Sequence, residues 1–167
     1  MKTIYFSHGK ESGPNGRKIQ SLVAVGKQNG FETHSIDYTH LENPDARVEH
    51  LLKTIEADKP KDDVILVGSS MGGYVSMAGS AKMKPAGMFL MAPALYLEGF
   101  KVQEFHPACP VEIVHGWNDG IIPFEHSLRF AEKQKCTLHL VNDDHRLSAS
   151  VGYLEVLFDA FLKGLGR

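Results

Sequence analysis

The sequence predicts an α/β protein, a three-layer α/β/α sandwich built around a mainly parallel sheet of six strands. Short runs rich in β-branched residues alternate with longer amphipathic runs along the whole chain, which is typical of strand–helix–strand units. The strand-like runs are almost continuously apolar, as in a parallel sheet that helices cover on both faces. With 167 residues and no repeat or linker, the chain is expected to form a single domain over residues 1–167.

The predicted elements follow one another in alternation, which favours a doubly wound arrangement with right-handed crossovers. The six strand-like segments are residues 2–7, 31–37, 63–68, 87–92, 111–116 and 136–141. The helix-like segments are residues 15–29, 44–58, 70–83, 123–134 and 149–164. The second helix illustrates the signals, because Pro44 follows Asn43 at its start and apolar residues then recur at helical spacing.

Composition excludes several functional classes. The formal net charge is −2, with basic and acidic residues interspersed, so neither nucleic acid nor an anionic membrane is an expected partner. Cys109 and Cys136 lie far apart and form no metal-binding pattern, so we expect buried free thiols. A β-like segment begins at once after Met1-Lys2, and no window approaches 18 apolar residues. These features predict a cytoplasmic protein.

The stretch VILVGSSMGGY, residues 64–74, carries the first chemical signal. A strand followed by G-x-S-x-G and a helix is the pattern of a sharp turn that exposes its central serine at the carboxyl edge of the sheet. Ser70 is that central residue, and Ser69 is expected to pack or to form hydrogen bonds. A plain glycine-rich turn or a phosphate loop is the alternative. Neither G-K-[ST] nor G-x-G-x-x-G follows a strand here, so we predict no cofactor.

A nucleophilic serine needs a base, and the base needs an acid that fixes its tautomer. Asp119 follows the fifth predicted strand, and His145 follows the sixth. The order Ser70, Asp119, His145 is the one used by hydrolases with the nucleophile at the edge of such a sheet. No metal is required.

Other acids and bases compete for these roles. Asp143 and Asp144 precede His145 directly, but neighbouring residues rarely face one another well enough to orient an imidazole. His8 and His115 also lie at strand ends and each precedes a glycine, so they are expected to brace loop backbone.

An acyl-transfer reaction also needs hydrogen-bond donors for the oxyanion. One candidate is the backbone N–H of Met71, which follows the nucleophile at the start of a helix. The other is the backbone N–H of Lys10, in the loop after the first strand, although His8-Gly9 is also compatible with a simple tight turn.

Four segments together resemble the α/β-hydrolase fold superfamily, in the form of its small, capless, bacterial esterase-like serine hydrolases: HGKESGPNGRK, GSSMGGY, HGWNDGIIP and DDHRL. The resemblance implies Ser70 as nucleophile, Asp119 as orienting acid and His145 as base. Larger relatives insert a cap domain after the fourth strand. Residues 92–110 are too short for a cap and long enough for a small flap.

The expected activity is cleavage of a small carboxylic ester through an acyl-enzyme. The acyl site is expected to be lined by apolar side chains of the flap and its surroundings, with ordinary core packing as the alternative: Leu95, Tyr96, Phe100, Phe105, Met71 and Phe124. A thioester on an anionic carrier is a second possibility, because Lys10, Arg17 and Lys18 are expected near the same mouth. A non-catalytic binding module on this fold is a third. The expected partner is thus a small acyl ester or thioester, and no oligomeric state is predicted.

Overall fold

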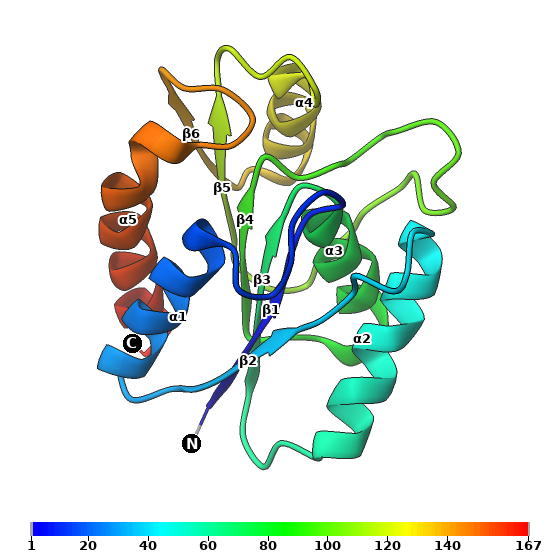
Figure 1. The fold of residues 1–167 in the computed structure, drawn as a ribbon, viewed down its shortest axis with the longest axis vertical. Coiled ribbons are helices and arrows are strands. Elements are labelled where there is room, and N and C mark those ends of the chain that lie inside the picture. Colours follow the sequence, from blue (N-terminus) through cyan, green and yellow to red (C-terminus); the bar gives the residue numbers. More distant parts are fainter. Residues whose placement is uncertain (1, 167) are drawn as a thin grey trace.

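The computed structural model describes residues 2–166 and contains one six-stranded sheet (Figure 1). The strands are β1 (Thr3–Ser7), β2 (Glu32–Ile36), β3 (Val64–Ser69), β4 (Gly87–Met91), β5 (Val111–Gly116) and β6 (Thr137–Val141). Their order is β2-β1-β3-β4-β5-β6, and each neighbouring pair is parallel. The predicted fold class is therefore confirmed.

Residues 2–166 also form five α-helices: α1 (Arg17–Gln28), α2 (Pro44–Asp58), α3 (Met71–Met83), α4 (Phe124–Gln134) and α5 (Val151–Gly164). The first four connect strands, and α5 follows β6. Helix α2 has the predicted bounds because Asn43 caps it, its side chain accepting hydrogen bonds from the N–H groups of Asp45 and Ala46. Helix α5 begins two residues later than predicted, after a 3₁₀ turn at Ser148–Ser150. None of the helices within residues 2–166 is both long and apolar enough to cross a bilayer.

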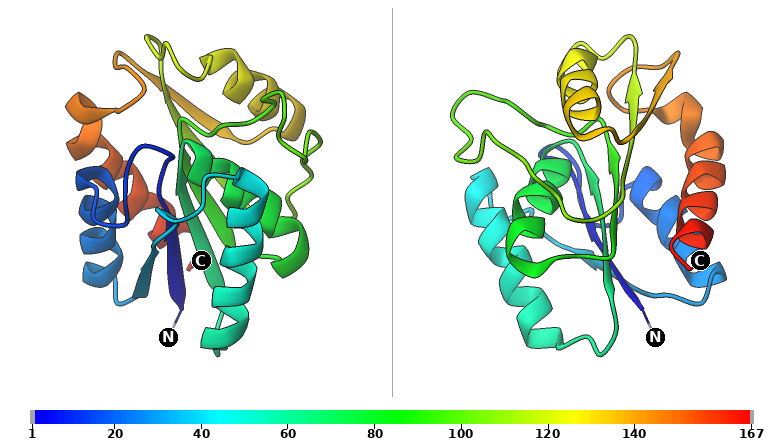
Figure 2. Two further views of the ribbon diagram at one scale, coloured as in Figure 1. Left: turned by 45° about the vertical axis from the view of Figure 1, so that its right-hand side comes forward. Right: turned by 180° about the vertical axis from the view of Figure 1, so that it is seen from behind.

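The helices form two layers, with α1 and α5 on one face of the sheet and α2, α3 and α4 on the other (Figure 2). Successive side chains of a strand point to opposite faces of the sheet, so each strand contributes residues to both cores. On β1, Ile4 and Phe6 pack in the core beneath α1 and α5, whereas Tyr5 lies in the core beneath α2 and α3. On β3, Leu66 likewise packs in the core beneath α2 and α3, whereas Ile65 and Val67 pack in the core beneath α1 and α5.

The strand order determines where a ligand can bind. The chain adds β2 on one side of β1 and then returns to add β3 on the other side. In open α/β sheets, such a reversal leaves a crevice outside the carboxyl ends of the two central strands. The loops that follow β1 and β3 contain Gly9 and Ser70, so these residues lie at the crevice.

Candidate active site

Ser70 occupies a strained turn between β3 and α3. Its backbone has φ of 54° and ψ of −117°, a region that residues with a side chain rarely adopt. Glycine is required on both sides of this turn, because a Cβ at Gly68 would lie 2.3 Å from the carbonyl oxygen of Gly72. A Cβ at Gly72 would lie 1.9 Å from the carbonyl oxygen of Ser7 on β1. The sharp turn therefore directs Ser70 to the carboxyl edge of the sheet.

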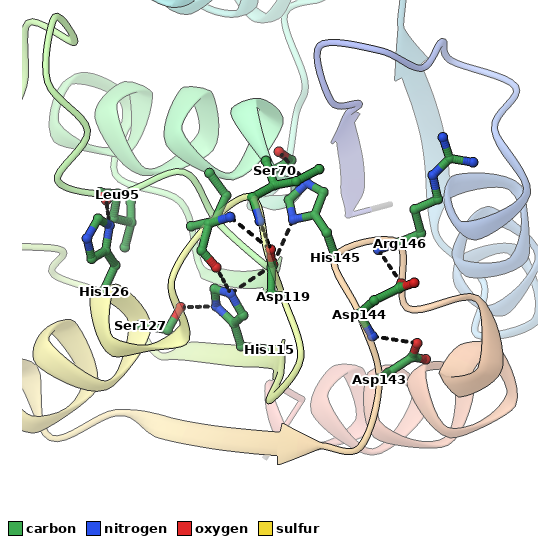
Figure 3. A network of polar contacts seen from close by, with 12 residues as sticks. Ser70, Leu95, His115, Asp119, His126, Ser127, Asp143, Asp144, His145 and Arg146 are labelled. Carbon is green, nitrogen blue, oxygen red and sulfur yellow. Dashed lines mark hydrogen bonds and ion pairs between the residues drawn. The ribbon is translucent and has the colours of Figure 1, made fainter.

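The side chains of Ser70, His145 and Asp119 form a continuous hydrogen-bonded chain (Figure 3). The Nε2 atom of His145 lies 2.9 Å from Oγ of Ser70, and its Nδ1 atom lies 2.7 Å from Oδ2 of Asp119. With the proton on Nδ1, the ring donates to the carboxylate, and Nε2 is left to accept from the serine hydroxyl. The side chain of Asp119 is fully buried, whereas that of His145 is 16% exposed.

Four donors surround the carboxylate of Asp119. Oδ1 accepts from the N–H groups of Ile121 and Ile122, each at 2.8 Å. Oδ2 accepts from His145 and lies 3.0 Å from Nε2 of His115. Burial acts to raise the pKa of Asp119, but the hydrogen bonds from His145 and from the two N–H groups outweigh it and lower the pKa. The carboxylate is therefore held in its ionised form.

His115 does more than the backbone bracing expected from the sequence. It is fully buried, and burial lowers the pKa of its imidazole. Its Nε2 atom lies 2.9 Å from the carbonyl oxygen of Ile122, as a brace would, but also contacts Asp119. Its Nδ1 atom lies 2.7 Å from Oγ of Ser127 on α4. A neutral ring that accepts from Ser127 and donates through Nε2 satisfies all three contacts and holds the acid in place.

The loop after β1 is held by a buried network. Nδ1 of His8 donates to the carbonyl of Gly9 at 2.7 Å, and Nε2 accepts from the N–H of Tyr38 at 2.9 Å. Arg47 on α2, only 2% exposed, donates at 3.2 Å to the carbonyls of both His8 and Gly9. His8 therefore braces the loop, as expected. From the sequence, we did not predict that Arg47 holds this loop. The signal was its spacing from Leu51 and Ile55, which places Arg47 on the buried stripe of the helix.

The same network orients the backbone of Lys10. The carbonyl of Gly9 points toward Arg47, and in a trans peptide the following N–H points the opposite way. A Cβ at Gly9 would lie 3.4 Å from Cβ of Ser70, so this peptide lies against the turn. Within residues 2–166, the N–H groups of Lys10 and of Met71 make no hydrogen bond. Both are therefore available as donors beside Ser70.

A cavity of about 760 Å³ opens above Ser70 and His145. Its walls combine apolar and charged side chains. The apolar residues are Ile19, Met71, Ala94, Leu97, Phe100, Ile121, Ile122 and Val151, and the charged ones are Lys10, Glu11, Arg17, Lys18 and Arg146. The expected approach of Lys10, Arg17 and Lys18 to one mouth is thus seen in the structure.

Of the six residues expected to line the acyl site, Met71 and Phe100 line this cavity and the other four do not. Leu95 is fully buried in the core, and its carbonyl accepts a hydrogen bond from His126. The ring of Tyr96 lies 3.9 Å from the guanidinium of Arg129, away from the cavity. Phe124 packs against Trp117 at the start of α4, with ring centroids 4.8 Å apart. Phe105 is likewise a core residue, packed against Tyr96 and Phe130.

Residues 92–110 form a long loop between β4 and β5 that reaches over α3 toward the start of α2 (Figure 1). The hydroxyl of Tyr74 accepts from the N–H of Val102 at 3.0 Å and donates to Asp45 at 2.5 Å. The carboxylate of Asp45 also accepts from the N–H of Lys101. Two helices beneath the flap thus hold its far end.

The structure offers no ligand set for a metal: within residues 2–166, no group of three or more His, Cys, Asp or Glu side chains could hold one. Cys109 and Cys136 are free thiols. Burial raises the pKa of each to about 11. Neither residue lines the cavity at Ser70.

Comparison with known proteins supports the assignment of the fold. Residues 2–102 match the uncharacterised protein family UPF0227, and no curated protein matches. A proposed hydrolase of the α/β superfamily from Xanthomonas campestris pv. campestris is 30% identical, with a TM-score of 0.90 over 97% of this chain and 98% of that chain.

Two further solved structures share the fold at lower identity. Est1E from Butyrivibrio proteoclasticus is 18% identical, with a TM-score of 0.85 over 98% of this chain and 87% of that one. A Xanthomonas campestris protein described as an α/β serine hydrolase without lid is 17% identical, with a TM-score of 0.82 over 97% and 81%. The chain therefore belongs to the UPF0227 family and has the α/β-hydrolase fold in a form without a cap domain.

Proposed function

We propose that this chain is a serine hydrolase that cleaves small carboxylic esters through an acyl-enzyme on Ser70. The observation that carries the proposal is the unbroken chain of contacts from Ser70 to His145 to Asp119, at 2.9 Å and 2.7 Å. A chance cluster of polar side chains would not place a buried, ionised acid, a correctly oriented imidazole and a strained serine in line beneath a cavity.

The mechanism follows from this geometry. His145 takes the proton of Ser70 as the hydroxyl oxygen attacks the ester carbonyl, and Asp119 stabilises the imidazolium that forms. The N–H groups of Met71 and Lys10 then stabilise the tetrahedral oxyanion. The imidazolium next protonates the departing alcohol. His145 finally activates a water that releases the acid and regenerates Ser70.

The test is covalent labelling with a fluorophosphonate, read by intact mass. One label per wild-type molecule is expected, with loss of labelling in Ser70→Ala and His145→Ala. Ser76→Ala is the matched control, because Ser76 lies on α3 and its buried hydroxyl has no hydrogen-bond partner within residues 2–166. Folded wild-type protein that resists the label would overturn the proposal in favour of a non-catalytic binding module.

Ester cleavage is then measured with p-nitrophenyl esters of increasing chain length, and with acyl thioesters as the competing class. We expect short acyl chains to be preferred, because the cavity has no cap above it. Thioester cleavage without ester cleavage would replace the proposed substrate class and leave the mechanism in place.

A further inference from the structure

Charge is distributed unevenly around the cavity. The protein as a whole carries a formal net charge of −2. The cavity wall, in contrast, contains the cations Lys10, Arg17, Lys18 and Arg146, and Glu11 is its only carboxylate among the described residues. No ion pair joins any of these four cations to a carboxylate within residues 2–166. On the cavity wall itself, four cations without an ion-pair partner therefore accompany one carboxylate, which favours a ligand with negative charge.

Lys18 is the least exposed of these cations. It lies in the first turn of α1 and is half-buried, whereas Lys10, Arg17 and Arg146 are exposed. Its Nζ atom donates to the carbonyl oxygen of Arg146 at 3.2 Å, which ties it to the loop that carries His145. An ammonium group has three donors, and within residues 2–166 this is its one hydrogen bond. Two donors remain for a ligand in the cavity.

Nearby carboxylates partly offset the effect of burial on the Lys18 ammonium group. Burial lowers the pKa of Lys18 to about 8, against the opposing attraction of the carboxylates of Asp119, Asp143 and Asp144. Asp119 is engaged by His145, and the N–H groups of Asp144 and Arg146 occupy oxygens of Asp143 and Asp144. Figure 3 shows these loop carboxylates bonded within their own turn, with the side chain of Arg146 directed away from them. The cation is thus near carboxylates but bonded to none.

We propose that this site prefers esters that carry an anionic group, a carboxylate above all, and that Lys18 binds that group. The inference rests on the proposed function, since it describes the substrate of the same site. The apolar wall of Leu97, Phe100 and Ile121 would hold the carbon chain. A partly buried ammonium that donates to a carboxylate forms a charge-assisted hydrogen bond, which is stronger than a neutral one.

The experiment compares matched pairs of esters that differ only in charge. One pair carries the charge in the acyl part: p-nitrophenyl hydrogen adipate and its neutral methyl ester. The other pair carries it in the alcohol part: p-acetoxybenzoate and its methyl ester. For each pair, the ratio of kcat/KM for the anionic ester to that for the neutral ester is measured in wild type, Lys18→Met and Lys18→Arg. Comparing ratios between variants removes the intrinsic difference in reactivity within a pair.

In at least one pair, we expect the ratio to fall about tenfold in Lys18→Met, mainly through KM of the anionic ester. Lys18→Arg is expected to retain most of the ratio, because it keeps the charge. Lys27→Met is the matched control, an exposed lysine on the same helix and far from the cavity wall, and its ratio is expected to equal that of wild type. High salt is expected to lower the wild-type ratio, since it screens the cations.

Each outcome bears on a different claim. Equal ratios in wild type and Lys18→Met for both pairs would overturn this inference while leaving the proposed hydrolase intact. Failure of the wild type to cleave any of the esters, together with an unlabelled Ser70, would overturn the proposed function and this inference with it. The pair that responds identifies which part of the substrate carries the anion.

Discussion

Replacement of Gly72 by alanine is expected to disrupt the junction of β1 and α3 that positions Ser70. The added Cβ would lie 1.9 Å from the carbonyl oxygen of Ser7, 2.4 Å from its carbonyl carbon and 2.7 Å from the carbonyl oxygen of His8. A carbon–oxygen contact normally requires about 3.3 Å, so one backbone must move by roughly 1.4 Å. Strand β1 is paired on both sides, by β2 and β3, and cannot give way alone.

The expected loss of stability follows from that displacement. Overpacking that side chains can absorb costs about 1–3 kcal/mol. The contacts at Gly72 are with backbone, so we expect a loss of at least about 3 kcal/mol, which for a domain of this size lowers Tm by roughly 10 °C. Movement of α3 would also shift the N–H of Met71, so fluorophosphonate labelling of Ser70 is expected to slow.

Thermal unfolding followed by circular dichroism measures the effect, with Gly152→Ala as the matched control. Gly152 lies in α5, and no atom lies within 4 Å of where its Cβ would be. Alanine is favoured over glycine in a helix by roughly 0.5–1 kcal/mol, so this variant is expected to be slightly more stable. If Gly72→Ala unfolds at the wild-type temperature and is labelled at the wild-type rate, the turn at Ser70 does not require glycine at position 72.

Three other expectations concern the site and its surroundings. Asp119→Asn is expected to lower kcat by about 10³- to 10⁴-fold. Because the folded-state pKa of Asp119 is lowered, its ionisation stabilises the protein above about pH 4 and ceases to do so as pH falls. The urea midpoint of the variant should therefore fall less than that of wild type between about pH 5 and pH 3. A steeper fall in the variant would contradict this expectation. Arg47→Met is expected to lower kcat about tenfold at constant KM, whereas Lys53→Met, a change at an exposed lysine of the same helix, is the control and should leave kcat unchanged. An unchanged kcat in Arg47→Met would show that Arg47 does not position the N–H of Lys10. Cys109 and Cys136, with pKa values of about 11, are expected to alkylate slowly until urea is added.

The sequence predicted which side chains meet at the sheet edge, because each of them closely follows a strand. Ser70 lies one residue beyond β3 and Asp119 three residues beyond β5, so both could be placed at the sheet edge from local pattern alone. His145 lies four residues beyond β6, yet the order of the three residues identified it. Strand order could not be obtained in this way, because it depends on which faces the helices cover.

The cavity wall was predicted poorly, for a related reason. Leu95 and Tyr96 lie in an irregular segment whose path depends on the contacts of Tyr74 and Asp45 with its far end. No periodicity in the sequence reports those contacts. The composition of residues 92–110 indicated an apolar flap. It did not indicate that Leu97 lines the cavity while Leu95, two residues earlier, is buried in the core.

The loops that form the cavity have a consequence for changing its specificity. Leu97, Phe100 and Ile121 belong to connections beyond the strands, and Ile121 is 68% exposed. The residues that hold the two halves of the core together lie on the strands and helices beneath. Variants at Ile121 can therefore be recombined in a library with little expected loss of folded protein. Leu97 and Phe100 also pack against the core and tolerate fewer changes, and diversity introduced around Gly68 and Gly72 would yield misfolded chains.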